Sequence, residues 1–587
     1  MKHLTVLLSF LLIVTASFSQ PSRNKLPVNT PDNSVQYKPS KHNFNSAVNP
    51  VLLDTSGSIP RLTQYYDYVT NGNNIQKLVV LGDTIIAASD FTDSLNAQNS
   101  SSRRTYYQVS TNGGVTWYSN AVLVLNNYSA YPYINPILIS NYRTITITGR
   151  GQVTGGAYAA TDVILGAGSF TYTYLPYAGS NGAIVSSPLN NNLIACAYSK
   201  SDTLYYRTFN PINNTFSSSP VFVSLFPTNS RYYISAGYNS TNVFVMWWDA
   251  SANTMKGRES TNSGTTFGSV YTILTNNTNI QGDLVTPWFP ADVTYKPGSN
   301  TPVVVLSTMA AGNYITAGGC KVIFWSPGIN GGQPVKVADW RNMPGTFISD
   351  TLNFSYNFRY LQVGMTPLSH PSIAFSSDGN TIGCAFSVIR SDTTSYGFHY
   401  NNVYCTISTN NGLNWANPRP ISCAIPDLPV LCQDCDEIYP TISKTGNTSG
   451  TFHVTYSLSS TPGSTSFTDV ITPVGKVYQV YKKFCTSIFV GIQPVSNEIP
   501  EEYRIEQNYP NPFNPKTIIK FDILKASDVR ITIYDVSGRE VQRLVQQKLN
   551  AGKYSVDFDA GHLSSGVYFY SIIAGDFVQT KKMILIK

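Results

Sequence analysis

One short pattern recurs seven times along this chain, and it constrains the fold more than any other feature of the sequence. Each copy has an apolar segment, a turn rich in Asn, Gly or Asp, and a second apolar segment. The copies begin at Leu78, Ile137, Ala183, Tyr233, Val293, Ile373 and Ile442. Two apolar segments joined by such a turn predict a β-hairpin. A hairpin that repeats at this spacing cannot cover its own apolar faces, so the seven copies must pack against one another.

The repeat predicts an all-β protein whose main part is a β-propeller. The composition agrees, because 13% of the residues are aromatic and only 12% are charged, against roughly 25% charged residues in an ordinary soluble domain. An aromatic residue or His followed by Pro precedes three copies, at Tyr131-Pro132, His370-Pro371 and Tyr439-Pro440. Proline suits the first residue of a strand, so we expect these steps to lead into the innermost strand of a blade. The repeat predicts seven blades, or six if one copy is an insertion.

Three octapeptides late in their repeats share a second pattern. They run from Ser110 to Trp117, from Ser260 to Phe267 and from Ser408 to Trp415. They resemble the Asp-box, or BNR repeat, of sialidase-like propellers, with Asn in place of the usual Asp. The residues that carry the resemblance are Ser110, Asn112, Gly114, Trp117, Ser260, Asn262, Gly264, Phe267, Ser408, Asn410, Gly412 and Trp415. The Asn side chain can accept hydrogen bonds from the turn backbone, and the Gly can adopt a positive φ. The resemblance implies a structural turn on the outer part of a blade.

A sialidase-like active site would need an arginine cluster, a Tyr nucleophile with a nearby Glu, and an acid/base Asp. The Arg-Ile-Pro motif of that family is absent, since Ile59-Pro60-Arg61 has another order. The candidate catalytic residues are Asp90, Asp162, Asp249, Arg150, Arg207 and Arg390, with Arg258 and Arg359 as further arginines. The alternative interpretation is that the carboxylates cap turns and the arginines lie on solvated strand edges. Glu259 directly precedes an octapeptide, so we expect it on an outer strand, where it would be a poor partner for a nucleophile.

Other chemistries find no support in the sequence. There is no HExxH pair, nucleophile elbow, P-loop or dinucleotide fingerprint. The lone Cys432-x-x-Cys435 lacks the second pair that a zinc site needs, so we expect no metal and no cofactor. The net charge of +7 includes no Lys/Arg run, which argues against a nucleic-acid partner. Five of the eight cysteines fall between Cys384 and Cys435, where we expect any disulfides.

The propeller is therefore expected to be a binding or surface-display module for glycans or proteins. Its many Tyr and Trp side chains could stack on sugar rings, although such residues on strands also form the core between blades. The alternative is a sialidase-like exo-glycoside hydrolase that uses the propeller funnel.

The two ends of the chain predict its route. Residues 1–19 have a short basic start, an apolar stretch and a small-x-small site, which is typical of a cleaved signal peptide. We expect an N-terminal linker over 20–55, the propeller over 56–490, a second linker over 491–502 and a C-terminal domain over 503–587. No further segment is long and apolar enough to span a membrane.

The C-terminal domain differs from the rest in its charge density and in its short, regularly alternating strands, which predict a small antiparallel, Ig-like β-sandwich. It opens with Asn508-Tyr509-Pro510-Asn511-Pro512-Phe513-Asn514-Pro515 and ends in a Lys-Lys-Met segment. These features resemble the sorting domain of type IX secretion. The residues that carry the motif are Asn508, Pro510, Pro512, Gly538, Gly566, Lys581 and Lys582. The resemblance implies export through the periplasm, recognition by the outer-membrane translocon, and a secreted or surface location.

Overall fold

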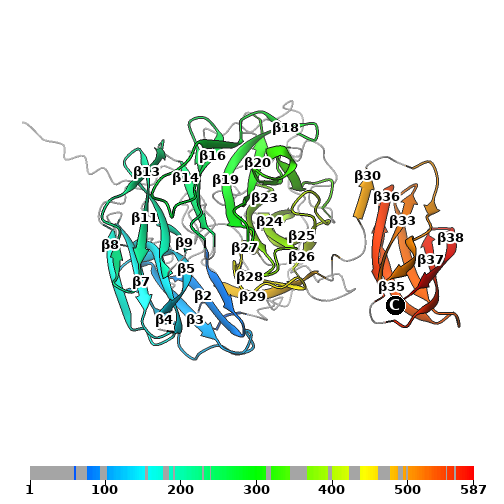
Figure 1. The fold of residues 1–587 in the computed structure, drawn as a ribbon, viewed down its shortest axis with the longest axis horizontal. Coiled ribbons are helices and arrows are strands. Elements are labelled where there is room, and N and C mark those ends of the chain that lie inside the picture. Colours follow the sequence, from blue (N-terminus) through cyan, green and yellow to red (C-terminus); the bar gives the residue numbers. More distant parts are fainter. Residues whose placement is uncertain are drawn as a thin grey trace, which may run out of the picture.

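The computed structural model describes most of the chain between Ser58 and Ile586. The described residues are 58–60, 62, 76–92, 102–139, 141–151, 156–175, 184–189, 192–227, 230–237, 240–311, 319–343, 366–393, 399–421, 436–459, 476–486, 489, 493–496, 500–549, 551–560 and 563–586. The expected signal peptide and N-terminal linker lie outside them. Strands dominate the described part (Figure 1), which confirms the predicted all-β class.

Seven antiparallel sheets follow one another between Leu78 and Cys485 among the described residues. The first has β1 (Leu78–Leu81), β2 (Thr84–Phe91), β3 (Arg104–Ser110) and β4 (Val122–Leu123). The second has β5 (Ser129–Ile139), β6 (Tyr142–Gly151), β7 (Gly156–Asp162) and β8 (Phe170–Leu175). The third has β9 (Val185–Pro188), β10 (Ile194–Lys200), β11 (Thr203–Asn210), β12 (Thr215–Phe216) and β13 (Val221–Leu225).

The other four sheets continue the series. The fourth has β14 (Arg231–Ala236), β15 (Val243–Asp249), β16 (Thr254–Ser260) and β17 (Val270–Leu274). The fifth has β18 (Thr278–Ile280), β19 (Asp283–Tyr295), β20 (Pro302–Ala310), β21 (Val322–Trp325) and β22 (Val335–Ala338), with a 3-10 turn at Asn330–Gly332. The sixth has β23 (Leu368–Phe375), β24 (Ile382–Thr393), β25 (His399–Ser408) and β26 (Arg419–Pro420). The seventh has β27 (Asp436–Ile442), β28 (Thr451–Ser459) and β29 (Val477–Cys485). Each of the seven sequence repeats forms one hairpin of a sheet, which is the first hairpin in six sheets and β19–β20 in the fifth.

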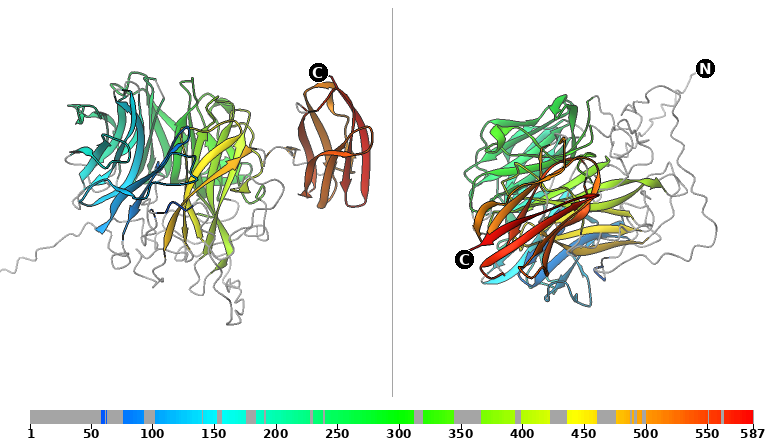
Figure 2. Two further views of the ribbon diagram at one scale, coloured as in Figure 1. Left: turned by 90° about the horizontal axis from the view of Figure 1, so that it is seen from below. Right: turned by 90° about the vertical axis from the view of Figure 1, so that its right-hand side faces the viewer.

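The sheets form a ring, as a propeller requires. The inner strands β1, β5, β9, β14, β19, β23 and β27 each contact the next one in this order. Figure 1 shows the sheets following one another around a common centre, and Figure 2 shows them from two further sides. The seventh sheet meets the first, because Val80 N donates to Thr445 Oγ1 (3.3 Å). In addition, Ser58 forms an isolated bridge with Val480, and Ile59 N donates to Gln479 O (2.8 Å). The seventh sheet thus gains an outer edge from a segment that precedes the first.

The aromatic-Pro steps lie slightly deeper in the strands than the sequence predicts. Tyr131, His370 and Tyr439 have positive φ values of 57°, 51° and 57°. The strand register shifts at these points, between Ala130 and Tyr133, for example. The three prolines therefore follow the left-handed residue of a β-bulge inside the strand. A bulge tolerates proline for the same reason that a strand's first residue does, because no ladder hydrogen bond needs its missing N–H.

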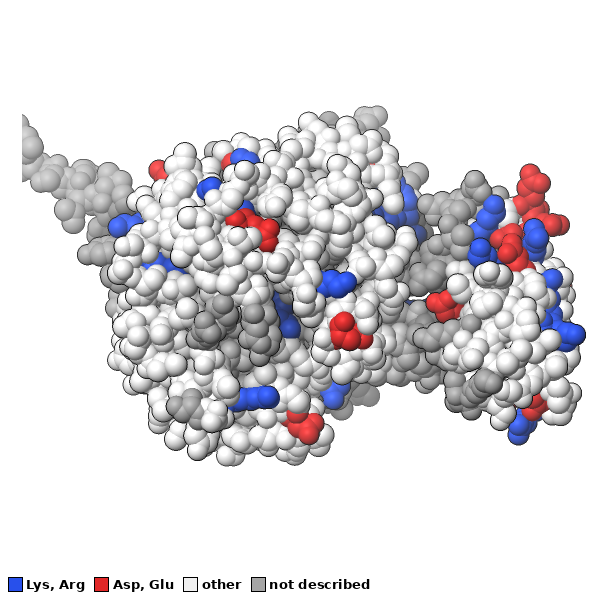
Figure 3. Space-filling model, in the orientation of Figure 1, with Lys and Arg blue, Asp and Glu red and all other residues white. Residues whose placement is uncertain are grey.

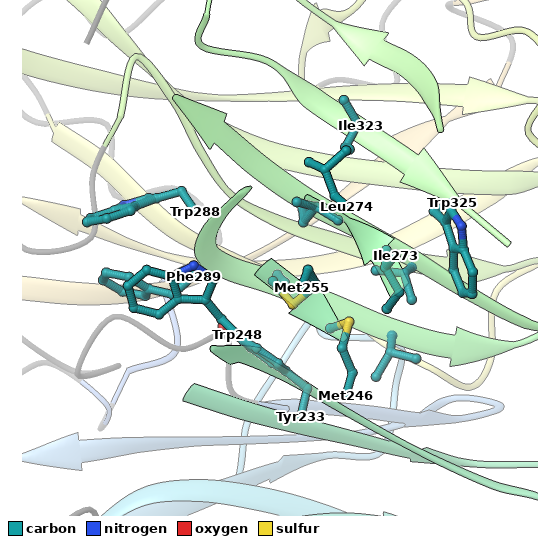
Figure 4. Close-up of a cluster of buried hydrophobic side chains, with 14 of the residues drawn as sticks. Tyr233, Met246, Trp248, Met255, Ile273, Leu274, Trp288, Phe289, Ile323 and Trp325 are labelled. Carbon is teal, nitrogen blue, oxygen red and sulfur yellow. The ribbon is translucent and has the colours of Figure 1, made fainter. Parts of the chain in front are cut away.

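The core lies in the spaces between neighbouring sheets. Figure 4 shows the cluster between the fourth and fifth sheets, where Met246, Trp248 and Met255 face Trp288, Phe289 and Trp325. These side chains come from strands of two neighbouring sheets, so much of the chain's aromatic content fills the gaps between blades.

The structure bears in part on the prediction that any disulfides lie between Cys384 and Cys435. Cys384 and Cys405 are buried thiols outside any disulfide, although they lie on paired strands. Cys384 pairs with Thr406 and Cys405 pairs with Ala385, so their side chains point to opposite faces of the sheet. Cys196 and Cys320 are likewise buried thiols outside any disulfide, whereas Cys485 is disulfide-bonded.

The C-terminal strands form a separate sandwich with its own core. They are β30 (Gln493–Ser496), β31 (Arg504–Ile505), β32 (Tyr509–Asn514), β33 (Lys516–Ile523), β34 (Ser527–Tyr534), β35 (Glu540–Leu549), β36 (Gly552–Asp559), β37 (Gly566–Ala574) and β38 (Phe577–Leu585). Strand β32 joins the two faces, because it pairs antiparallel with β33 and parallel with β38. The buried side chains between the faces include Phe521, Ile531 and Met583. Charged side chains are sparse on the propeller face in Figure 3 and denser on the sandwich.

Candidate functional site

The three octapeptide turns share one hydrogen-bond pattern. In the first, Gly114 N donates to Ser110 Oγ (3.0 Å) and Thr116 N donates to Asn112 Oδ1 (2.8 Å). The second repeats these bonds at 2.9 and 3.0 Å, and the third repeats them at 2.9 and 2.9 Å. The glycines at their centres, Gly114, Gly264 and Gly412, have φ values of 88°, 81° and 87°. Asn thus does the work of an Asp here, because only its carbonyl oxygen is needed to accept the backbone bond.

Each turn also packs on an aromatic side chain of the preceding sheet. A Cβ atom on Gly114, Gly264 or Gly412 would overlap the ring of Tyr481, Tyr206 or Phe324, respectively. The aromatic residue of the octapeptide contacts the same ring, with centroid distances of 6.1 Å for Trp117–Tyr481, 5.5 Å for Phe267–Tyr206 and 5.7 Å for Trp415–Phe324. Each turn therefore forms a tight packing contact between two neighbouring sheets.

Asp162 holds a related turn at the end of β7. Its carboxylate accepts hydrogen bonds from Gly166 N (3.0 Å), Ser169 N (3.1 Å) and the Tyr107 hydroxyl of the preceding sheet. Gly166 has a φ of 85°, and Phe170 lies 6.2 Å from Tyr107. Asp162 thus plays the part of the Ser that opens the three octapeptides, with the same four-residue step to a left-handed glycine.

A different group of residues gathers at the opposite edge of the sheets. In a meander of strands, the start of the inner strand, the end of the second strand and the start of the third strand meet at one edge. We call the residues found there the mouth cluster: Lys77, Asp90, Arg103, Tyr128, Tyr131, Arg150 and Arg231. All seven are buried.

Two arginines of the mouth cluster lie against tyrosine rings. The Arg103 guanidinium carbon is 4.7 Å from the centre of the Tyr131 ring and 5.5 Å from that of Tyr128. Arg103 Nη2 also donates to Tyr128 Oη (3.0 Å), and the Arg150 guanidinium carbon lies 5.9 Å from the same ring. Burial raises the pKa of Tyr128 to about 12, against the opposing effect of Arg103. Tyr128 therefore stays a neutral phenol that separates two cations.

Asp90 is the carboxylate of the mouth cluster. Its oxygens accept hydrogen bonds from Tyr131 N (3.0 Å) and Thr105 Oγ1 (3.2 Å). Burial raises its pKa to about 6, although Arg103, these hydrogen bonds and Lys77 oppose the rise. Burial likewise lowers the pKa of Lys77 to about 8, with Asp90 opposing. At neutral pH both groups are charged, and each titrates closer to neutrality than it would in water.

Arg231 extends the mouth cluster to the fourth sheet. Its guanidinium carbon lies 5.3 Å from the centre of the Phe289 ring. Phe289, Trp288 and Trp248 form the aromatic group at the left of Figure 4, with centroid distances of 4.7 to 5.5 Å. Tyr232 lies within electrostatic range of both arginines, because burial raises its pKa to about 12 while Arg231 and Arg150 oppose the rise. The arrangement offers guanidinium groups with fixed planes beside large aromatic faces.

The other predicted site residues lie elsewhere. Asp249 caps the turn after β15 by accepting from Ser251 N (3.1 Å) and Ala252 N (3.2 Å), and it pairs with Lys256 (2.9 Å). Burial alone would raise its pKa, but Ser251 and Lys256 hold it below the ordinary value. Arg207 donates to Tyr198 Oη (3.2 Å) and Ser217 O (2.7 Å), and Arg390 lies 5.5 Å from the Tyr400 ring centre.

Arg258 and Glu259 also lie away from the mouth cluster. Arg258 donates to Val223 O (2.6 Å) and Gly268 O (2.7 Å) on outer strands, and Arg359 lies outside the described residues. Glu259 accepts from Tyr295 Oη (3.1 Å). This Tyr–Glu pair lies near the ends of β19 and β16, at the edge that holds the octapeptide turns. It is therefore not part of the mouth cluster.

Sequence reasoning selected Asp90 and Arg150 but missed Lys77, Arg103, Tyr128 and Arg231. A usable signal was present. Lys77 and Arg231 each stand at the beginning of an inner strand, and Arg103 stands just before a third strand. Cations at these repeat positions would have directed attention to one edge of the propeller.

The sorting motif is divided between buried and exposed residues. Asn508 is buried, and its side chain donates to Pro510 O (3.1 Å) and Thr517 Oγ1 (3.0 Å). Gly538, with a φ of 78°, forms the turn between β34 and β35, and Gly566 begins β37. Lys581 and Lys582 lie on β38 opposite Tyr570 and Phe569. Pro510 and Pro512 are exposed.

We expect the charge of Asp90 to destabilise the folded state at neutral pH. Its pKa is about 6 in the folded protein and 3.8 in an unfolded chain, so the folded protein binds an extra proton between these values. The difference corresponds to about 3 kcal/mol at pH 7, and this penalty disappears as the pH falls through 6 toward 4.

Urea unfolding of the wild type and of Asp90→Asn from pH 7 to pH 4 measures this effect. The stability of the wild type should rise relative to that of Asp90→Asn as the pH falls. Parallel stability curves would show that Asp90 titrates normally.

The described residues form a β-propeller followed by a small β-sandwich. Residues 507–587 match the family model described as the secretion system C-terminal sorting domain. The chain is therefore a type IX secretion cargo, exported to the cell surface or released, and its partner in export is the type IX machinery. No helix among the described residues is long and apolar enough to cross a membrane.

Comparison with curated proteins finds no match. Among solved structures, a mutant of the NanB sialidase from Streptococcus pneumoniae is similar at 10% identity and a TM-score of 0.33, covering 57% of this chain and 67% of the other. A glycosyl hydrolase from Bacteroides ovatus matches at 12% identity, covering 50% and 95% with a TM-score of 0.25. A prolyl endopeptidase matches at 10% identity and a TM-score of 0.34, and this chain covers 54% of its length. These TM-scores are too low to define a common fold. The assignment of a propeller is based instead on the seven sheets and their contacts in this structure.

Proposed function

We propose that the propeller is a binding module, displayed at the cell surface or released, that recognises acidic glycans through the mouth cluster. The observation that carries this proposal is the placement of Arg103, Arg150 and Arg231 against aromatic rings. A guanidinium that stacks by its face donates hydrogen bonds in its own plane, which suits a bidentate contact with a carboxylate. The neighbouring aromatic residues suit the apolar face of a sugar ring.

The electrostatics of the mouth cluster support an anionic ligand. The cations Lys77, Arg103, Arg150 and Arg231 are all buried. Charge–charge attraction is stronger where water is excluded, so these cations favour a carboxylate-bearing ligand over a neutral glycan. Binding should accordingly weaken as salt concentration rises.

Glycan-array binding of the full chain, with sialylated, uronic-acid and neutral glycans, tests the proposal. Arg150→Lys keeps the positive charge but loses the planar fork. We expect it to weaken binding of acidic glycans about tenfold, the effect of losing one charge-assisted contact. Thermal unfolding should show that this variant remains folded.

Lys200→Ala is the matched control, since Lys200 is an exposed cation at the end of β10. It should bind like the wild type. Equal binding of neutral and acidic glycans, or no effect of Arg150→Lys, would contradict the proposal.

A second candidate function is exo-glycoside hydrolysis, and one observation favours it. The pKa of Asp90, about 6 because of burial, lies in the range of a general acid. The phenol pKa of Tyr128, about 12, argues against a Tyr nucleophile in the same cluster. A panel of chromogenic glycosides decides between the two. Turnover that Asp90→Asn abolishes would establish the hydrolase, and binding without turnover would establish the binding module.

A further inference from the structure

The sorting domain presents an exposed tyrosine on a closely fixed segment of backbone. The Tyr509 side chain is 80% exposed, although its neighbours in the sequence are held by several hydrogen bonds. The backbone of Asn508 is fixed, because its N–H donates to Tyr570 Oη (2.8 Å). The Asn508 side chain and Thr517 Oγ1 both donate to Pro510 O, at 3.1 and 2.8 Å. A large aromatic side chain is thus held out to solvent on a fixed segment of backbone.

The far side of the same segment is fixed as well. Asn511 Oδ1 accepts from Ile584 N (2.9 Å) on β38, and Ile586 N donates to Phe513 O (2.9 Å). Phe513 itself is buried in the core of the sandwich. The buried residues of the motif therefore anchor β32 from below, and Tyr509 has no part in this anchoring.

A second exposed apolar side chain lies beside Tyr509. Ile518 on β33 is the register partner of Tyr509 and is 42% exposed. Side chains of opposed residues in an antiparallel pair lie on the same face, close enough to touch. Pro510 and Pro512 are exposed next to them, and Asp557, opposite Ile518 on β36, adds an exposed charge at the edge. An apolar centre with a polar edge is the usual composition of a protein contact.

We propose that Tyr509 and Ile518 form the contact by which the type IX translocon recognises this domain. The binding partner follows from the domain itself. Residues 507–587 match a secretion sorting domain, and such a domain must present a surface that the secretion machinery can bind. The contact is an aromatic anchor that enters an apolar pocket of the translocon, supported by Ile518. Aromatic anchors of this kind carry a large share of the binding energy at protein interfaces.

The test is the export of the full-length protein in a bacterium that has type IX secretion. Tyr509→Ala and Ile518→Ala should each lower the amount of protein at the surface and in the medium, with accumulation in the periplasm. We expect about a tenfold loss for Tyr509→Ala, as for removal of an interface anchor. Tyr509→Phe keeps the ring and should be exported like the wild type.

Val536→Ala is the matched control, because Val536 is 74% exposed in the same domain but lies in the turn between β34 and β35. It should be exported normally. Thermal unfolding of the purified full chain should be the same for all four variants, since each changes an exposed side chain. Normal export of Tyr509→Ala and Ile518→Ala would overturn the proposal, and so would an equal loss of export in Val536→Ala.

Discussion

Replacing Gly264 with alanine is expected to lower the free energy of unfolding of the propeller by about 3 kcal/mol. Two costs add in this estimate. Gly264 has a φ of 81°, and a left-handed conformation costs a residue with a Cβ about 1–2 kcal/mol. The new Cβ would also overlap the Tyr206 ring of the preceding sheet, and such overpacking costs about 1–3 kcal/mol. Chemical unfolding followed by the fluorescence of the aromatic core measures the loss.

Gly298→Ala separates the two costs. Gly298 has a φ of 68° but nothing within 4 Å of its Cβ position, so this variant reports the backbone cost alone. The difference between the two variants is then the cost of disturbing the contact between sheets. Equal losses of stability in Gly264→Ala and Gly298→Ala would mean that the packing of Gly264 on Tyr206 contributes nothing to the free energy of unfolding.

The same reasoning shows which part of the fold the sequence could predict. The seven hairpins were predictable because each is local, with a turn and two apolar segments adjacent in the chain. The octapeptide turns were predictable for the same reason. Their contacts with Tyr481, Tyr206 and Phe324 were not, because each ring lies on a different sheet and the pattern does not encode the partner.

The candidate site shows where prediction from the sequence stops. Asp90, Asp162 and Asp249 have the same local context, an Asp at the end of an apolar strand. The structure gives them different surroundings: Asp90 lies among cations, Asp162 holds a turn between two sheets, and Asp249 caps its own hairpin. The difference arises from contacts between residues far apart in the chain, such as Tyr131 N with Asp90. The N-terminal contribution of Ser58 and Ile59 to the seventh sheet was missed for the same reason.

Replacing Asp339 with alanine is expected to destabilise the propeller by about 3–5 kcal/mol, the usual cost of removing one partner of a buried ion pair. Asp339 and Lys321 are both fully buried in the fifth sheet. Asp339 Oδ2 lies 3.3 Å from Lys321 Nζ and 2.8 Å from Arg341 Nη1, and Lys336 Nζ lies 3.2 Å from Oδ1. Asp283, at the start of β19, joins the same network at 2.6 Å from Lys321. Without Asp339, the ammonium of Lys321 keeps one carboxylate partner among the described residues, Asp283.

A double variant separates two explanations for the loss of stability: the buried Lys321 charge left without Asp339, and the loss of the contacts that Asp339 itself makes. If the buried Lys321 charge causes most of the loss, adding Lys321→Met to Asp339→Ala should recover a large part of the stability. Additive losses in the double variant would instead mean that the two side chains act independently. Urea unfolding of the four proteins in the cycle gives the coupling directly.

The same network should make the propeller sensitive to acid. Burial alone would raise the pKa of Asp339, but Lys336, Lys321 and Arg341 hold it below its ordinary value of 3.8. A carboxylate with a lowered pKa contributes stability that is present above the ordinary value and is lost as the pH falls through the folded value. Asp90 has the opposite dependence, because its raised pKa relieves a penalty between pH 6 and 4. The contribution of Asp90 to stability should therefore increase on mild acidification, and that of Asp339 should fall only below a pH of about 4. Over the mild range, His370 and His453 act against Asp90, because burial lowers the pKa of each imidazole. Asp339→Ala should remove part of the fall, and Asp90→Asn should remove the increase.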